Sequence, residues 1–101
     1  MRYKIYYNKG LKMSPSKLAS QIAHVTLNLG YDLGVGEYGD CYFSSKDQVI
    51  VVLGLSATKF KQKVAELDQL GYSTGVFIHI QDDLGITEVD AGTTTACGYI
   101  E

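Results

Sequence analysis

The sequence lacks tryptophan and contains only one proline and two cysteines among its 101 residues. Two cysteines make no disulfide framework, and neither they nor the two histidines have a second ligand at a metal-binding interval. We therefore expect no metal, and we expect Cys41 and Cys97 to be buried free thiols rather than a disulfide. No apolar run approaches a membrane span, and the N-terminus lacks the apolar core of a signal peptide, which favours a cytoplasmic protein.

The sequence also lacks a strong net charge of either sign. The formal net charge of −2 does not suggest a general nucleic-acid binder. The distribution is uneven, however, because the basic residues of the N-terminal part all precede the first acid, Asp32, whereas acids gather at residues 82–90. Either one region of the surface is basic, or these charges form an ordinary solvated shell.

The amino-acid composition is that of a folded domain. Apolar residues make up 46% and charged residues 20% of the chain, which argues against disorder. A length of 101 residues is enough for one core and too short for two. We therefore expect a single domain over residues 1–101.

The first half of the chain predicts a strand and a helix. The strand is expected at residues 5–7 with their flanks. In the helix that follows, Ser14 suits the N-cap and Pro15 the first helical position, and apolar residues recur at helical spacing as far as a terminal glycine, Gly30. Residues 30–47 show no period and predict an irregular connection.

The second half predicts three strands and one helix. Residues 48–53 form a β-branched run that is typical of a strand buried on both faces. Ser56 suits the N-cap of a helix that Gly71 ends. Its predicted core face consists of Phe60, Val64, Leu67 and Leu70. With strands at residues 76–80 and 94–100, the order β-α-β-α-β-β predicts an α/β fold with helices packed on a mixed sheet.

Three polar residues share one face of the first predicted helix. Lys17 lies in its first turn, where it either remains solvated or joins free backbone N–H groups in holding a phosphate or an oxyanion. Gln21, one turn on, either orients a substrate or is surface filler. His24 either shuttles protons or bonds a neighbouring carbonyl group.

A second polar segment follows the third predicted strand. Asp83 has three readings: it binds Lys17, accepts a proton from water, or stabilises a turn. Gly85, between Asp83 and Thr87, allows either a positive φ or close approach of a ligand. Thr93 and Thr95 are expected at the start of the last strand, with hydroxyl groups available to a ligand.

Two ordered motifs connect these segments to a known family. The chain has Lys-Met at residues 12–13 and Lys-Leu-Ala-Ser-Gln-Ile-Ala-His at residues 17–24. It later has Asp-Leu-Gly-Ile-Thr-Glu-Val at 83–89 and Gly-Thr-Thr-Thr-Ala-Cys-Gly at 92–98. With both motifs at the expected separation, the chain resembles the archaeal and eukaryotic type of peptidyl-tRNA hydrolase, called type 2, over nearly its whole length.

The resemblance implies a three-layer α/β fold with a four-stranded mixed sheet. It also implies a protein of translation that binds tRNA and hydrolyses, without a metal or other cofactor, the ester joining a peptide to the terminal ribose. Asp83 or His24 would activate water and Lys17 would stabilise the oxyanion. On this basis we assign residues to catalysis (Lys17, His24, Asp83 and Thr87) and to substrate binding (Lys12, Gln21, Gly85, Thr93 and Thr95). The expected partner is the acceptor end of peptidyl-tRNA, with no membrane.

Several positions depart from the family pattern. Residues 8–11 lack its usual arginine and aspartate, Ser-Pro-Ser at 14–16 replaces a glycine- and lysine-containing stretch, and Glu88 replaces glutamine. The sequence also stops at Glu101, short of the family's usual closing helix and strand, which would leave a sheet edge open for a homodimer. These departures favour a second hypothesis, a non-catalytic relative that acts as a binding or regulatory module for protein or nucleic acid.

Overall fold

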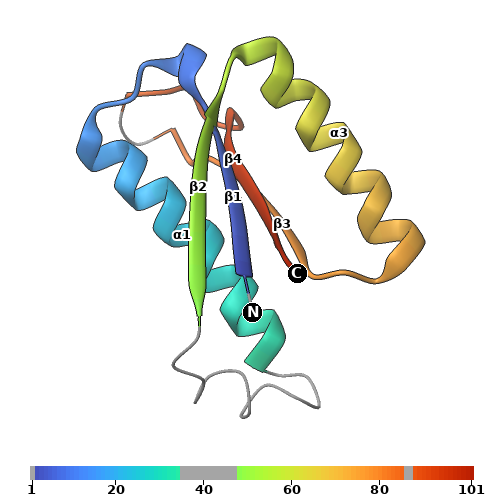
Figure 1. Cartoon of the computed structure of the whole chain (residues 1–101). Helices are drawn as coiled ribbons and strands as arrows, with labels where there is room; N and C mark the ends of the chain where they lie inside the picture. Colours follow the sequence, from blue (N-terminus) through green and yellow to red (C-terminus); the bar gives the residue numbers. More distant parts are fainter. Residues whose placement is uncertain (1, 35–47, 86–87) are drawn as a thin grey trace.

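The computed structural model describes residues 2–34, 48–85 and 88–101. Its sheet has four strands in the order β2-β1-β4-β3, with one long helix on each side (Figure 1). The elements, in chain order, are β1 (Arg2–Asn8), the short 3-10 helix η1 (Lys9–Leu11), α1 (Pro15–Gly34), β2 (Val49–Leu55), α3 (Ala57–Thr74), β3 (Ile78–Asp82) and β4 (Thr94–Ile100).

The sheet is mixed, as predicted. Strand β1 runs parallel to β2 and antiparallel to β4, and β3 is antiparallel to β4. The last strand in sequence therefore lies inside the sheet, between β1 and β3. These pairings confirm the α/β fold with a four-stranded mixed sheet and the predicted order of strands and helices, to which the structure adds η1.

Two apolar clusters fill the spaces between the sheet and the helices. Successive side chains of a strand point to opposite faces, so β1 supplies both clusters. The cluster under α1 contains Tyr3, Ile5, Val25, Leu29 and Ala96. The cluster under α3 contains Tyr6, Phe60, Leu67 and Cys97. The sheet is thus the middle of three layers, with α1 on one face and α3 on the other.

Both helices run beyond the glycines that were predicted to end them. Helix α1 continues past Gly30 to Gly34 because Leu33 is also buried, and its packing outweighs the small helix-breaking tendency of glycine. Helix α3 continues past Gly71, and Gly75 caps it in the left-handed conformation at φ 70°. The predicted core face of α3 is confirmed by the packing of its four apolar residues against the cluster under α3.

Strand β2 differs most from its prediction. It is an edge strand, and Val49, Ile50, Val52 and Leu53 are between 39% and 52% exposed, whereas the β-branched run predicted burial on both faces. A β-branched run favours an extended backbone but does not determine whether the strand lies at the edge of the sheet or inside it. The predicted irregular connection falls mostly on residues 35–47, outside the described residues.

Burial also determines the state of the second cysteine. Cys97 is a fully buried free thiol, as predicted, and loss of solvent raises its pKa to about 12. Such a thiol remains protonated and unreactive at neutral pH. Cys41 lies outside the described residues. None of the described helices is both long and apolar enough to cross a membrane.

Candidate functional site

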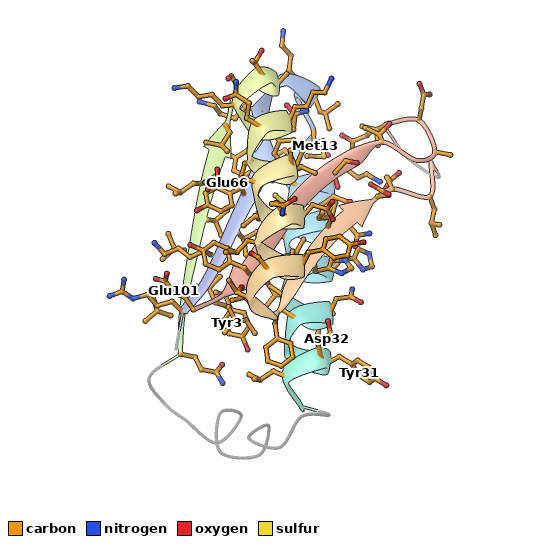
Figure 2. All side chains as sticks on the ribbon, turned by 90° about the vertical axis from the view of Figure 1, so that its right-hand side faces the viewer. Tyr3, Met13, Tyr31, Asp32, Glu66 and Glu101 are labelled. Carbon is orange, nitrogen blue, oxygen red and sulfur yellow. The ribbon has the colours of Figure 1, made fainter. Side chains whose placement is uncertain are left out.

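The two polar segments meet at the N-terminal end of α1. The connection between β3 and β4 lies at this end, close to where Met13 leads into α1, whereas Tyr31 and Asp32 lie near the opposite end of the helix (Figure 2). Among the described residues of these segments, four polar side chains are buried: Lys17, Gln21, Asp83 and Thr95. We call these four residues the polar cluster.

An ion pair is the centre of the polar cluster. The Lys17 Nζ atom lies 2.6 Å from the Asp83 Oδ1 atom, and the two residues are only 8% and 7% exposed. They are 66 positions apart in sequence. Of the three readings of Asp83, the structure therefore contains the contact with Lys17. Because removing a charge from water is costly, each buried charge depends on the other for compensation.

Gln21 extends the ion pair toward β4. Its Nε2 atom donates to the Asp83 Oδ1 atom at 3.2 Å, and its Oε1 atom accepts from the Thr95 hydroxyl at 2.5 Å. Gln21 is 2% exposed, so it is no surface filler. The amide thus links a charged group on one side to a neutral hydroxyl on the other.

A β-bulge explains how Thr95 reaches α1. On β3, Gln81 pairs with Ala96 and Asp82 with Thr94, so Thr95 is an extra residue without a partner in this register. Ala96 packs under α1, and simple alternation would turn Thr95 toward α3. The bulge interrupts this alternation and turns the hydroxyl toward Gln21.

Backbone hydrogen bonds hold Asp83 in place at the start of the β3–β4 connection. Its N–H donates to the Thr93 carbonyl at 2.9 Å, and its carbonyl accepts from the Gly92 N–H at 2.8 Å. The Gly85 N–H donates to the Asp83 Oδ2 atom at 2.8 Å, which forms the local turn that the sequence suggested. Gly85 has a φ of 78°, and a Cβ there would lie 2.5 Å from the Ala91 nitrogen. Close approach at Gly85 is thus to the protein's own backbone.

The surroundings of Asp83 lower the pKa of its carboxyl group. The largest cause is the hydrogen bond from Lys17, followed by the bond from the Gly85 N–H, while burial acts in the opposite direction. The carboxylate is therefore ionised at neutral pH and stabilises the nearby ammonium charge.

Two backbone N–H groups at the start of α1, those of Ser14 and Lys17, have partners within the protein. Ser14 Oγ accepts from the Lys17 N–H at 3.2 Å, so Ser14 is the N-cap, as expected. Pro15 has no N–H. The Ser14 N–H donates to the Glu88 Oε1 atom at 2.7 Å, and its hydroxyl donates to the Oε2 atom at 2.5 Å. Glu88 therefore places a carboxylate at the cap of α1, and Ser14 lowers its pKa through these two bonds.

A small pocket opens between the end of β1 and the first turn of α1. It has a volume of about 260 Å³ and is lined by Tyr7, Asn8, Lys9, Lys12, Met13 and Leu18. Lys9 and Lys12 are exposed, and Lys12 has a φ of 51°, with its N–H bonded to the Lys9 carbonyl. The pocket therefore combines positive charge with apolar walls.

The remaining predicted residues lie outside the polar cluster. His24 is exposed on α1, and none of the hydrogen bonds described here joins its side chain to the cluster. Thr93 is half-buried and contributes its backbone to the β3–β4 connection. Thr87 lies outside the described residues. Within residues 2–34, 48–85 and 88–101, no three His, Cys, Asp or Glu side chains gather as candidate metal ligands.

Ser14 and Glu88 form a contact that the sequence did not reveal. Ser14 was identified only as a cap and Glu88 only as a departure from the family pattern. A local capping box would place the acid three residues after the cap, where this chain has Lys17. The sequence offered one signal for this contact. Ser14 and Glu88 both depart from the family pattern, they lie in the two segments that carry the polar cluster, and a hydroxyl group can donate to a carboxylate.

The fold and the polar cluster define a small three-layer α/β protein with a buried ion pair at one end of its sheet. The sequence profile of the family described as Peptidyl-tRNA hydrolase PTH2 matches residues 1–100. The chain therefore belongs to this peptidyl-tRNA hydrolase family, which confirms the resemblance. No curated protein matches the chain.

Proposed function

We propose that this protein hydrolyses the ester bond between the peptide and the tRNA of peptidyl-tRNA. Membership of the family supports this class of reaction. The observation on which the proposal rests is the buried contact of Lys17 with Asp83, because a charged pair held in a water-poor site is the kind of group that ester hydrolysis needs. The alternative is a non-catalytic binding module with the same fold.

Lys17 is the proposed electrophilic group. Attack of water on the ester carbonyl places negative charge on the carbonyl oxygen. The ammonium group of Lys17 can stabilise that charge while it remains bonded to Asp83, since an ammonium has three N–H donors. The Lys17 backbone N–H already donates to the Ser14 hydroxyl, so this role is assigned to the lysine side chain.

Asp83 is the first candidate for activating water, and His24 is the second. The Asp83 carboxylate is ionised, so it can orient a water molecule and accept its proton, but the hydrogen bonds that lower its pKa also make it a weaker base. As the intermediate collapses, the bond to the ribose oxygen breaks, and that oxygen takes up the proton that the base received from water. The products are a peptide with a free carboxyl group and tRNA with a free ribose hydroxyl.

The acceptor end of the tRNA is proposed to bind in the pocket beside the first turn of α1. Lys9 and Lys12 supply positive charge for phosphate groups, and Tyr7, Met13 and Leu18 supply apolar surface for a base or ribose. The proposed location of the protein is the cytoplasm, where translation produces peptidyl-tRNA. Thr87 remains a predicted catalytic residue, and Gln21, Gly85, Thr93 and Thr95 remain predicted contributors to substrate binding.

The test is release of tRNA from peptidyl-tRNA by the purified protein. We expect Lys17→Ala and Asp83→Asn each to lower kcat by about 10²–10³-fold, because each removes a group that acts on developing charge. Lys61→Ala removes an exposed lysine of α3 and should leave kcat unchanged. His24→Ala decides between the two candidate bases, since it should abolish turnover only if His24 takes the proton.

Wild-type protein that folds but does not release tRNA at high protein concentration would contradict the proposal. Binding of tRNA without turnover would then favour the alternative, the non-catalytic module.

A further inference from the structure

Glu88 makes the closest contact between the β3–β4 connection and the cap of α1. Each oxygen of its carboxylate accepts one hydrogen bond from Ser14, at 2.7 Å from the N–H and 2.5 Å from the hydroxyl. The two residues are 74 positions apart in sequence. One surface carboxylate is thus bound in a defined orientation by a single residue of another element.

The backbone of Glu88 is also unusual. Its φ is 60°, and among the described residues only Lys12 shares a positive φ without being glycine. A side-chain-bearing residue rarely adopts this conformation, and it persists where surrounding contacts determine it. The two bonds to Ser14 are such contacts, and they join the charge to the positive end of the α1 dipole.

The same helical turn carries Lys17. Ser14 caps it through the Lys17 N–H, and the Leu18 N–H donates to the Ser14 carbonyl at 2.9 Å. The β3–β4 connection therefore touches the first turn of α1 at two points, through Glu88 on Ser14 and through Asp83 on Lys17. Two attachments fix both the distance and the relative orientation of the two segments, which a single ion pair does not.

We propose that Glu88 is a positioning residue, which holds the β3–β4 connection on the cap of α1 and thereby keeps Asp83 on Lys17. Glu88 acts through Ser14 and does not touch the reacting atoms. As far as catalysis is concerned, this role rests on the proposed hydrolase function.

The first test measures the Asp83 pKa by carboxyl ¹³C NMR and does not depend on activity. In wild type this pKa should lie below its ordinary value of 3.8 because of Lys17 and Gly85. In Glu88→Ala it should rise toward 3.8, because the connection is no longer held on α1. In Glu88→Gln it should stay low, since an amide can still accept from the Ser14 N–H and donate to its hydroxyl oxygen.

The second test measures hydrolysis by the same variants. Glu88→Ala should lower kcat at least tenfold while changing KM less than twofold, and Glu88→Gln should restore most of the rate. The matched control is Glu66→Ala, which removes an exposed glutamate of α3, the helix nearest the viewer in Figure 2. Should Glu88→Ala unfold the protein, Ser14→Gly removes one of the two bonds and preserves a tolerated cap residue.

The outcomes separate the two proposals. An Asp83 pKa that is unchanged in a folded Glu88→Ala or Ser14→Gly variant would overturn the positioning role. A raised pKa with an unchanged kcat would overturn its part in catalysis. A wild-type protein without turnover would refute the hydrolase function, and the pKa comparison would still decide whether Glu88 positions Asp83.

Discussion

The amide of Gln21 has only one suitable orientation in the polar cluster. Its oxygen needs a donor, which Thr95 supplies, and its nitrogen needs an acceptor, which Asp83 supplies. Among the described residues, no buried side-chain nitrogen or oxygen lacks a hydrogen-bond partner. Each buried polar atom of the cluster therefore has at least one partner, and the loss of one member deprives another of a hydrogen bond.

Thr95→Val tests this dependence. Valine has nearly the same shape, but it leaves the buried Gln21 oxygen without its donor, so unfolding should become easier by about 1–3 kcal/mol. Urea unfolding measures the difference. Thr95→Ser retains the hydroxyl group and should restore most of the free energy of unfolding that Thr95→Val loses. If the two variants lose equal free energy of unfolding, the methyl group matters and the hydrogen bond does not.

Some of these residues were predictable and others were not. Helical spacing placed Lys17 and Gln21 on one face, and the family motif placed Asp83 near them; the structure brings these three together. The bulge that turns Thr95 toward α1 depends on the register between β3 and β4, which no local pattern records. Glu88 was missed for a similar reason, because its partner is distant in sequence.

At the level of elements, Gly98 sets how closely α1 approaches the sheet. A Cβ at this position of β4 would lie 2.7 Å from the Lys4 carbonyl oxygen and 3.0 Å from the Val25 Cγ1 atom. The first neighbour is backbone of the adjacent strand and cannot move away freely. Packing of α1 on β4 therefore requires a residue without a side chain here.

Gly98→Ala should consequently destabilise the protein by about 2–3 kcal/mol, as overpacking of a core does. The control is Gly75→Ala, because a Cβ at Gly75 meets nothing within 4 Å and only the left-handed φ of 70° is strained. That strain should cost about 1 kcal/mol. Equal unfolding free energies for the two variants, measured in urea, would contradict a steric role for Gly98.

Whether a segment forms a helix or a strand was predictable from the sequence where the apolar pattern was long. The residues at which these elements begin and end were not. The cap at Ser14 and the core face of α3 followed from local chemistry. Gly30 and Gly71 failed as helix ends because tertiary packing decides such positions: Leu33 extends the buried face of α1, and Gly71 lies against Ile78. The edge position of β2 likewise depends on strand order.

For the molecule as a whole, the net charge of −2 provides little long-range attraction for the tRNA that the proposed function requires. The positive charge near the site is local, with Lys9 and Lys12 at the pocket. If these two residues contact one phosphate each, the slope of log affinity against log salt concentration should be about −1.4 to −1.8.

Lys12→Ala should therefore reduce this slope by about 0.7–0.9, the share of one phosphate contact. Binding of tRNA measured over a salt series tests this, with Lys61→Ala on α3 as the matched control. An unchanged slope for Lys12→Ala would exclude the pocket as the phosphate site. A homodimer stays a prediction, which sedimentation can examine under the same conditions.

The position of β4 has a consequence for how the protein is made. A ribosome delivers residues 94–100 after the other three strands that the structure describes, yet this strand belongs between β1 and β3. Until it emerges, the nascent chain has a gap in the middle of its sheet, and Asp83 lacks the Thr93 carbonyl that anchors it. The sheet and the anchoring of Asp83 are therefore completed only after residues 94–100 have been made, and such non-local pairing makes folding slow relative to a helical bundle of the same size.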